Sequence, residues 1–155
     1  DEGQLMPRGE RLDLSRLLGG LIEFHGLAAE EKGVSLSLEG EAVVMGDALM
    51  IRRAISNLLS NAIRHTPSGG AVSVKLRTQA DGVVVDVVNT GETIPADRVP
   101  RLFDRFFRAD ASRTGEGRQS GLGLAIVKSI AEAHRGSVSA ASEGGVTCFS
   151  LSLPA

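Results

Sequence analysis

The chain has 155 residues, of which 42% are hydrophobic and 23% are charged, and its formal net charge is -2. These values are typical of one globular domain, and a weakly negative chain gives no electrostatic reason to expect a nucleic-acid partner. The longest apolar runs are far shorter than the roughly 18 residues that cross a bilayer, which predicts a soluble piece. The first residue is Asp1 rather than methionine, so we expect a segment of a longer protein.

A first helix is predicted over residues 12–32, because apolar residues recur there at helical spacing and Gly33 follows as a C-terminal glycine. Two short strands are expected over 34–38 and 42–45, with a Glu-Gly turn between them. The opening third of the chain is therefore predicted to form one helix and two strands.

A second helix should run from a cap at Asp47 to about His65, and it carries two asparagines, Asn57 and Asn61, four residues apart. Each asparagine costs a helix interior roughly 0.5 kcal/mol relative to alanine. Both share one stripe with Arg64 and His65, opposite an arc of apolar residues. The stripe is either a solvated face or a binding face, and the motifs in the rest of the chain distinguish between these two interpretations.

A hairpin is expected next, with an alternating strand over 72–76 and a second strand over 83–89. The following region, about 90–120, is irregular except for one short helix expected near 96–102. It is longer than most loops in compact folds, and we interpret it as a lid.

A third helix should begin at Leu124 and end before Gly136, and strands over 137–141 and 146–153 close the chain. This order of elements predicts an α+β fold, with helices on one face of a mixed, mostly antiparallel sheet. The single cysteine, Cys148, is interpreted as a small buried hydrophobe rather than a nucleophile or ligand.

Two glycine-containing segments are candidates for ligand binding. Residues 89–94 follow a strand, where an ordinary turn is the simpler explanation. Residues 120–124 place small residues at a helix start, where backbone N–H groups favour an anion such as phosphate, and a plain hinge is the alternative. The Walker-type phosphate loop GxxxxGK[ST] is absent.

Residues 101–108 gather three of the five phenylalanines among arginines. A small core that anchors the lid is the favoured explanation for Phe103 and Phe106, and a partner surface is the alternative. His25 and His134 are assigned no role, and no cluster of side chains has the spacing of a dedicated zinc or calcium site.

Together and in this order, four motifs resemble the catalytic and ATP-binding domain of bacterial sensor histidine kinases. The N box is similar to residues 57–66, the first glycine box to 89–94, the F box to 101–108 and the second glycine box to 120–124. The residues of the last two motifs are similar to those found in the branch of this family that senses copper, zinc or cadmium. Metal sensing itself belongs to another part of such proteins.

The resemblance implies a fold and a domain boundary. The fold is a two-layer α/β sandwich of the Bergerat or GHKL type, with three helices on one face of the sheet and an ATP lid at about 90–120. Residues 12–155 form the catalytic and ATP-binding domain, and residues 1–11 form a linker from a missing dimerisation and phosphoacceptor domain.

The resemblance also implies roles for particular residues. Asn61 is the ligand of the Mg²⁺ ion that bridges the ATP phosphates, and Asn57 completes the polar shell beside it. Arg64 lies against phosphate, His65 lies near the nucleotide, and Arg108 reaches the γ-phosphate during transfer. The other expected nucleotide-binding residues are Asn89, Gly91, Ile94, Phe103, Ser120, Gly121, Leu122, Gly123 and Leu124.

Three positions depart from the family's pattern. Asn89 stands where aspartate normally accepts a hydrogen bond from the adenine amino group, so that bond is neutral and weaker by about 1 kcal/mol. Thr93 replaces the second glycine of the first glycine box, and Gln119 replaces the first glycine of the second.

The implied activity is a protein histidine kinase that binds Mg·ATP and transfers the γ-phosphate to a histidine on its own dimerisation domain. A response regulator would receive the phosphate next, and the isolated fragment would be inactive. The alternative is an ATP-sensing module without phosphotransfer, whereas a gyrase-type clamp is disfavoured. The domain is expected in the cytoplasm, as part of a homodimeric inner-membrane sensor that meets the membrane only through its missing N-terminal part.

Overall fold

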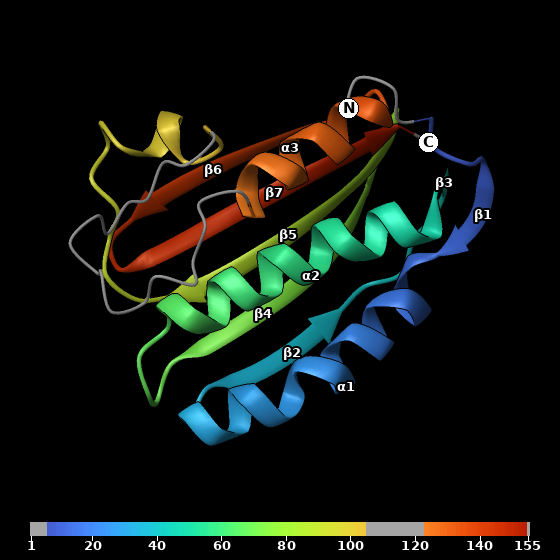
Figure 1. The fold of residues 1–155 in the computed structure, drawn as a ribbon. Coiled ribbons are helices and arrows are strands. Elements are labelled where there is room, and N and C mark those ends of the chain that lie inside the picture. The colour runs from blue at the N-terminus through green and yellow to red at the C-terminus, as the bar shows by residue number, and fades with distance from the viewer. Residues whose placement is uncertain (1–5, 105–122, 155) are drawn as a thin grey trace.

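The computed structural model describes residues 6–104 and 123–154, which form three helices on one face of a five-stranded sheet (Figure 1). The helices are α1 (Leu14–Lys32), α2 (Ala48–His65) and α3 (Gly123–Ala133). The sheet contains, in spatial order, β2 (Ser35–Glu39), β4 (Ala71–Gln79), β5 (Gly82–Thr90), β7 (Val146–Pro154) and β6 (Ser137–Glu143). Among these described strands, β2 and β4 pair in parallel and the other neighbours pair antiparallel. The predicted α+β sandwich with a mixed, mostly antiparallel sheet is therefore confirmed.

A small second sheet, which the sequence did not predict, joins β1 (Glu10–Asp13) to β3 (Val43–Gly46). Leu12 is buried in β1 opposite Val44, so α1 begins at Leu14 and not at residue 12 as expected. Asp13 caps the helix by accepting from the backbone N–H of Arg16. The pairing of β1 also takes in residues 10 and 11, which were expected to belong to a linker.

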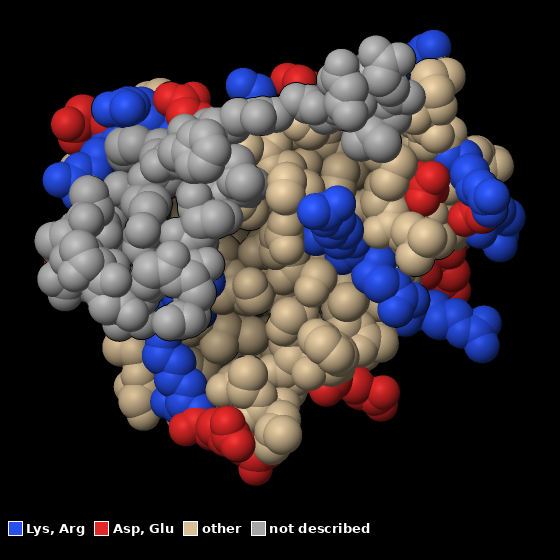
Figure 2. Space-filling view, in the orientation of Figure 1, with Lys and Arg blue, Asp and Glu red and all other residues tan. Residues whose placement is uncertain are grey.

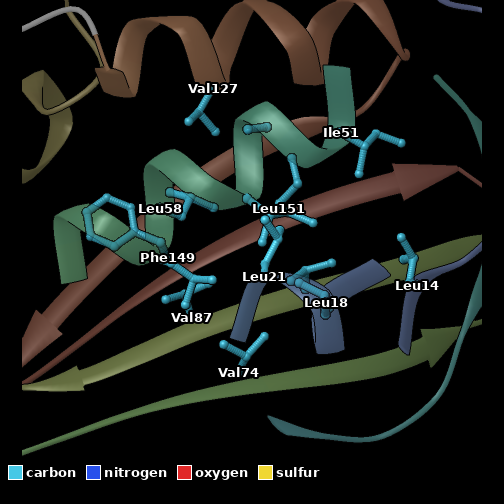
Figure 3. Packing of buried hydrophobic residues seen from close by; sticks show 14 of the residues in the cluster. Leu14, Leu18, Leu21, Ile51, Leu58, Val74, Val87, Val127, Phe149 and Leu151 are labelled. Carbon is cyan, nitrogen blue, oxygen red and sulfur yellow. The ribbon is translucent and has the colours of Figure 1, made fainter. Parts of the chain in front are cut away.

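The core lies between the helices and the inner face of the sheet (Figure 3). Its largest fully buried members from the helices and β3 are Leu14, Leu18, Val44, Ile51, Ile55, Leu58 and Leu59, and those from the sheet are Val72, Val74, Val85, Phe149 and Leu151. Burying each such side chain contributes about 1.5–3 kcal/mol, so this layer holds α2 firmly against the sheet.

The outer face of the sheet is not covered by helices, and it holds Cys148. Alternation along β7 turns Phe149 and Leu151 inward, so Cys148 and Ser150 point outward, and the cysteine is half-buried on this face rather than fully buried as expected. On this face Ser150 donates to Asp86 at 2.7 Å, and Arg77 forms an ion pair with Asp86 at 2.6 Å.

The helix expected near 96–102 is reduced to a single 3-10 turn, η2 (Val99–Arg101). Pro100 lacks a backbone N–H donor, so it interrupts the hydrogen bonds that a helix over residues 96–102 requires. Phe103 follows the turn and meets Phe149 edge to face, with ring centroids 5.9 Å apart. That contact with the core confirms the anchoring interpretation for Phe103, whereas Phe106 lies outside the described residues.

No helix in the described ranges has both the length and the apolar character needed to cross a bilayer.

Candidate functional site

Asn57, on the polar stripe predicted on α2, contacts the beginning of α3. Asn57 is half-buried, and its Nδ2 donates to the carbonyl oxygen of Gly123 at 3.1 Å. The opposite arc of α2 is fully packed, because its apolar residues from Ile51 to Ile63 are buried. The stripe is therefore not a freely solvated face, since one of its asparagines joins α2 to α3.

One turn further along α2, Asn61 pairs with Arg64. The Nη2 atom of Arg64 donates to Oδ1 of Asn61 at 3.1 Å, and both side chains are half-buried. The amide oxygen has a second lone pair, and oxygen is the ligand that Mg²⁺ prefers. A guanidinium beside it is suited to bind phosphate. Asn61 and Arg64 thus fit a metal–phosphate group, with Asn61 as the residue that would hold the metal.

Lys32 contacts the C-terminal end of α2, which the sequence did not predict. Lys32, the last residue of α1, donates from Nζ to the carbonyl oxygen of Ile63 at 2.9 Å and to that of Arg64. Burial lowers the pKa of Lys32, and the positive charge of Arg64 lowers it further. No local pattern could have predicted this contact, because Lys32 and Ile63 are 31 residues apart.

At the end of β5, Asn89 is buried, and its Nδ2 donates to the carbonyl oxygen of Thr90 at 3.2 Å. Opposite Asn89 on β7 lies Thr147, which is also buried. Thr147 bonds to Ser142, whose Oγ accepts from the backbone N–H of Ile94 at 2.8 Å. Sequence reasoning missed Thr147, although it is the polar residue on the apolar, inward-facing register of the last strand.

Gly91 brings the end of β5 against the end of α2. A Cβ atom at Gly91 would lie 2.8 Å from the carbonyl oxygen of His65, and its φ is +155°. The N–H of Gly91 donates to the carbonyl oxygen of Gly145 in the β6–β7 turn at 2.9 Å. Thr93 accepts from the N–H of Gly145 at 2.7 Å. Thr93, which stands where the family has a glycine, therefore forms a specific hydrogen bond in this position.

The structure thus brings several of the described site residues into contact with one another. Asn57 meets Gly123, Asn61 meets Arg64, and Gly91 meets His65. Leu124, Ile94 and Phe103 pack partly buried against the core. Four predicted site residues, Arg108, Ser120, Gly121 and Leu122, lie outside the described residues, and so does Gln119.

The two histidines left without a role both have structural partners. His25 is buried and bonds through Nε2 to Ser56 at 2.8 Å, across the α1–α2 contact. His134 accepts at Nε2 from the backbone N–H of Asp47 at 3.0 Å. Neither lies among the clustered site residues. In the view of Figure 2, acidic side chains lie towards the margins of this face, and a row of basic side chains runs from its right edge towards the middle.

These motifs and this sandwich define an ATPase of one known class. The chain belongs to the family of histidine kinase-, DNA gyrase B- and HSP90-like ATPases, whose model matches residues 46–155. Several relatives within the family are sensor kinases. The chain is 47% identical to the sensor histidine kinase CusS of Escherichia coli K12 over 156 residues, which cover 100% of this chain and 32% of CusS.

A second relative is the sensor protein CzcS of Cupriavidus metallidurans, 40% identical over 144 residues that cover 92% of this chain and 30% of CzcS. These matches confirm the similarity to the heavy-metal-sensor branch. The chain spans about a third of the length of these curated relatives.

Solved structures agree on the fold. The nucleotide-free catalytic domain of the histidine kinase ThkA superposes with a TM-score of 0.84 at 22% identity and covers 95% of each chain. Full-length ShkA superposes with a TM-score of 0.79 at 26% identity, over 95% of this chain and 32% of ShkA.

Proposed function

We propose that this chain is the ATP-binding catalytic domain of a two-component sensor histidine kinase. It binds Mg·ATP and transfers the γ-phosphate to a histidine on a separate dimerisation domain. The observation that supports this best is the convergence of three motifs distant in sequence. The N box on α2 touches the second glycine box through Asn57 and Gly123, and it touches the first glycine box through His65 and Gly91.

The base of the nucleotide is assigned to the buried end of β5. Asn89 and Thr147 are polar side chains on an otherwise apolar face, both almost fully buried, and they lie opposite each other on adjacent strands. Because Nδ2 of Asn89 already donates to the carbonyl of Thr90, its Oδ1 is the atom left to accept from an adenine amino group. ShkA, whose structure is similar to this fold, has been crystallised in complex with AMPPNP.

The phosphates and Mg²⁺ are assigned to the other side of the site. Asn61 would hold the metal through Oδ1, and Arg64 would turn its guanidinium from Asn61 toward phosphate. When bound, Mg²⁺ neutralises charge on the phosphates during transfer. Arg108, which lies outside the described residues, is proposed to stabilise the γ-phosphate, as the family resemblance implies.

Partners and location follow the same proposal. The phosphoacceptor histidine would lie on the protein's own dimerisation domain, and the phosphate would pass to a response regulator. ThkA has been crystallised with the response regulator TrrA. The domain would lie in the cytoplasm as part of a membrane sensor, in keeping with the sensor kinases that it resembles.

Calorimetric titration of ATP with and without Mg²⁺, into the wild type and Asn61→Ala, tests the binding part of the proposal. The chain has no tryptophan or tyrosine, so intrinsic fluorescence would report little. We expect Mg²⁺ to strengthen ATP binding in the wild type and to lose most of that effect in Asn61→Ala. Equal Mg·ATP affinity in both proteins would show that the metal assignment is wrong.

Phosphotransfer is tested by joining the chain to a dimerisation domain with an intact acceptor histidine. An acid-labile phosphohistidine is the expected product. ATP binding with no phosphohistidine would favour the ATP-sensing module, the alternative motivated by Asn89, Thr93 and Gln119.

A further inference from the structure

Lys32 ties the end of α1 to the end of α2. It is the last residue of α1, and its ammonium group donates to two successive carbonyl oxygens in the final turn of α2, those of Ile63 and Arg64. The last carbonyls of a helix have no partner within the helix, and they carry the negative end of its dipole. A lysine from a neighbouring helix therefore satisfies them in both hydrogen bonding and charge.

The neighbouring backbone fixes the place from which Lys32 reaches across. Gly33, in the left-handed region with φ +81°, accepts at its carbonyl oxygen from the N–H of Gly69 at 2.7 Å. A Cβ atom on Gly33 would lie 2.5 Å from Oγ of Ser68, so the loop after α2 packs directly on the end of α1. The two helix ends are thus locked together at the point where Lys32 acts.

The contact of Lys32 adjoins the proposed phosphate site, because Arg64 takes part in both. Lys32 holds the backbone carbonyl of Arg64, and the side chain of that same arginine donates to Oδ1 of Asn61. Without the ammonium group, the carbonyl oxygen of Arg64 loses this donor and that of Ile63 is left with the backbone N–H of Thr66 at 3.3 Å, so the last turn can fray or rotate. Arg64 lies in that turn, so the backbone position from which its side chain extends would no longer be fixed.

We propose that Lys32 is a positioning residue for nucleotide binding, which holds the last turn of α2 so that Arg64 and Asn61 face the phosphates and Mg²⁺. The inference rests on the proposed function of the site. Lys32 acts through the α2 backbone and needs no contact with the nucleotide, so it is not a catalytic residue. It extends the site by a residue from a helix that carries none of the four sequence motifs.

The test compares Mg·ATP affinity in Lys32→Met, which keeps the aliphatic stem, with that in Lys32→Arg, which keeps a charged donor. Lys75→Met is the matched control, because Lys75 is exposed on β4 and the change in net charge is the same. We expect Lys32→Met to weaken Mg·ATP binding roughly threefold to tenfold, Lys32→Arg to recover most of the affinity, and Lys75→Met to match the wild type.

A double-mutant cycle with Asn61→Ala separates positioning from general stability. If Lys32 acts through Arg64 and Asn61, Lys32→Met should cost less Mg·ATP affinity in the Asn61→Ala background than in the wild type. The inference is overturned if Lys32→Met binds Mg·ATP as the wild type does, or if it loses the same factor in both backgrounds. Failure of the wild type itself to bind Mg·ATP would instead reject the proposed function.

Discussion

The side-chain amide of Asn57 donates to the carbonyl oxygen of Gly123, which joins the middle of α2 to the first residue of α3. At the other end of α3, His134 accepts from the backbone N–H of Asp47, the cap of α2. The two helices run antiparallel, and these bonds hold them together at both ends of α3. Asn57 therefore links the N box to the second glycine box, whatever further part it has in binding.

Replacing Asn57 with alanine should remove this link. We expect the free energy of unfolding to fall by about 0.5 kcal/mol, because one lost hydrogen bond costs about 1 kcal/mol and alanine regains roughly 0.5 kcal/mol of helix propensity, and we expect Mg·ATP binding to weaken as well. Urea unfolding and calorimetry measure the two effects. Ser60→Ala, at an exposed position on the same helix, should gain a similar amount of helix propensity and leave Mg·ATP binding unchanged. An Asn57→Ala variant as stable as Ser60→Ala would mean that the bond to Gly123 contributes nothing.

Gly91 and Gly20 should respond to alanine in opposite directions. At Gly91 the new Cβ would meet the carbonyl oxygen of His65, so we expect a loss of about 1–3 kcal/mol and weaker ATP binding. At Gly20, exposed on α1, a Cβ meets nothing within 4 Å, and alanine should stabilise by about 0.5–1 kcal/mol through helix propensity. Thermal unfolding of both variants checks the prediction, and a destabilised Gly20→Ala would contradict it.

Asp86→Asn should lose stability in a pH-dependent way. Burial raises the pKa of Asp86, but hydrogen bonds from Arg77 and Ser150 and the charge of Arg77 outweigh it and hold that pKa below its ordinary value. The ionised carboxylate therefore stabilises the fold above about pH 4, and this contribution is lost as the pH falls through the lowered native pKa.

At pH 7 we expect Asp86→Asn to unfold more easily by about 1–3 kcal/mol, with a gap that narrows below about pH 4. Urea titrations across this range provide the measurement. Asp81→Asn, in the exposed turn between β4 and β5, serves as the control and should behave as the wild type. A gap that stays constant down to acid pH would argue against an ionised Asp86 as its source.

Cys148 should react slowly in the folded protein. Its burial raises the pKa of the thiol, the neighbouring Asp86 raises it further, and a hydrogen bond with Ser150 offsets only part of this. At pH 8 we expect iodoacetamide to modify native Cys148 about tenfold more slowly than a free thiol, because the thiolate is the reactive form. Mass spectrometry follows the reaction, and the urea-unfolded chain supplies the free rate. Equal native and unfolded rates would contradict this account.

Much of the fold was predictable because its elements are long and regular. The 3.6-residue period of α2 placed Asn57 and Asn61 on one stripe, and the two-residue period of β5 and β7 located the central strands. The four-residue strand β1 was missed because its partner β3 lies about 30 residues away and so short a segment carries no periodic signal. Cys148 was predicted to be buried from its apolar residue type, although its alternation with Phe149 along β7 places it on the outer face.

By itself, the sequence determined the order of the longer helices and strands, the family and the residue types of the site, because each depends on local periodicity or on short motifs. Only the tertiary structure decided which of those residues meet. Contacts such as Lys32 with the end of α2, Gly91 with His65, and Asn89 opposite Thr147 join segments that the chain separates widely. Such contacts follow from how helices pack on a sheet, and no local pattern in the chain encodes them.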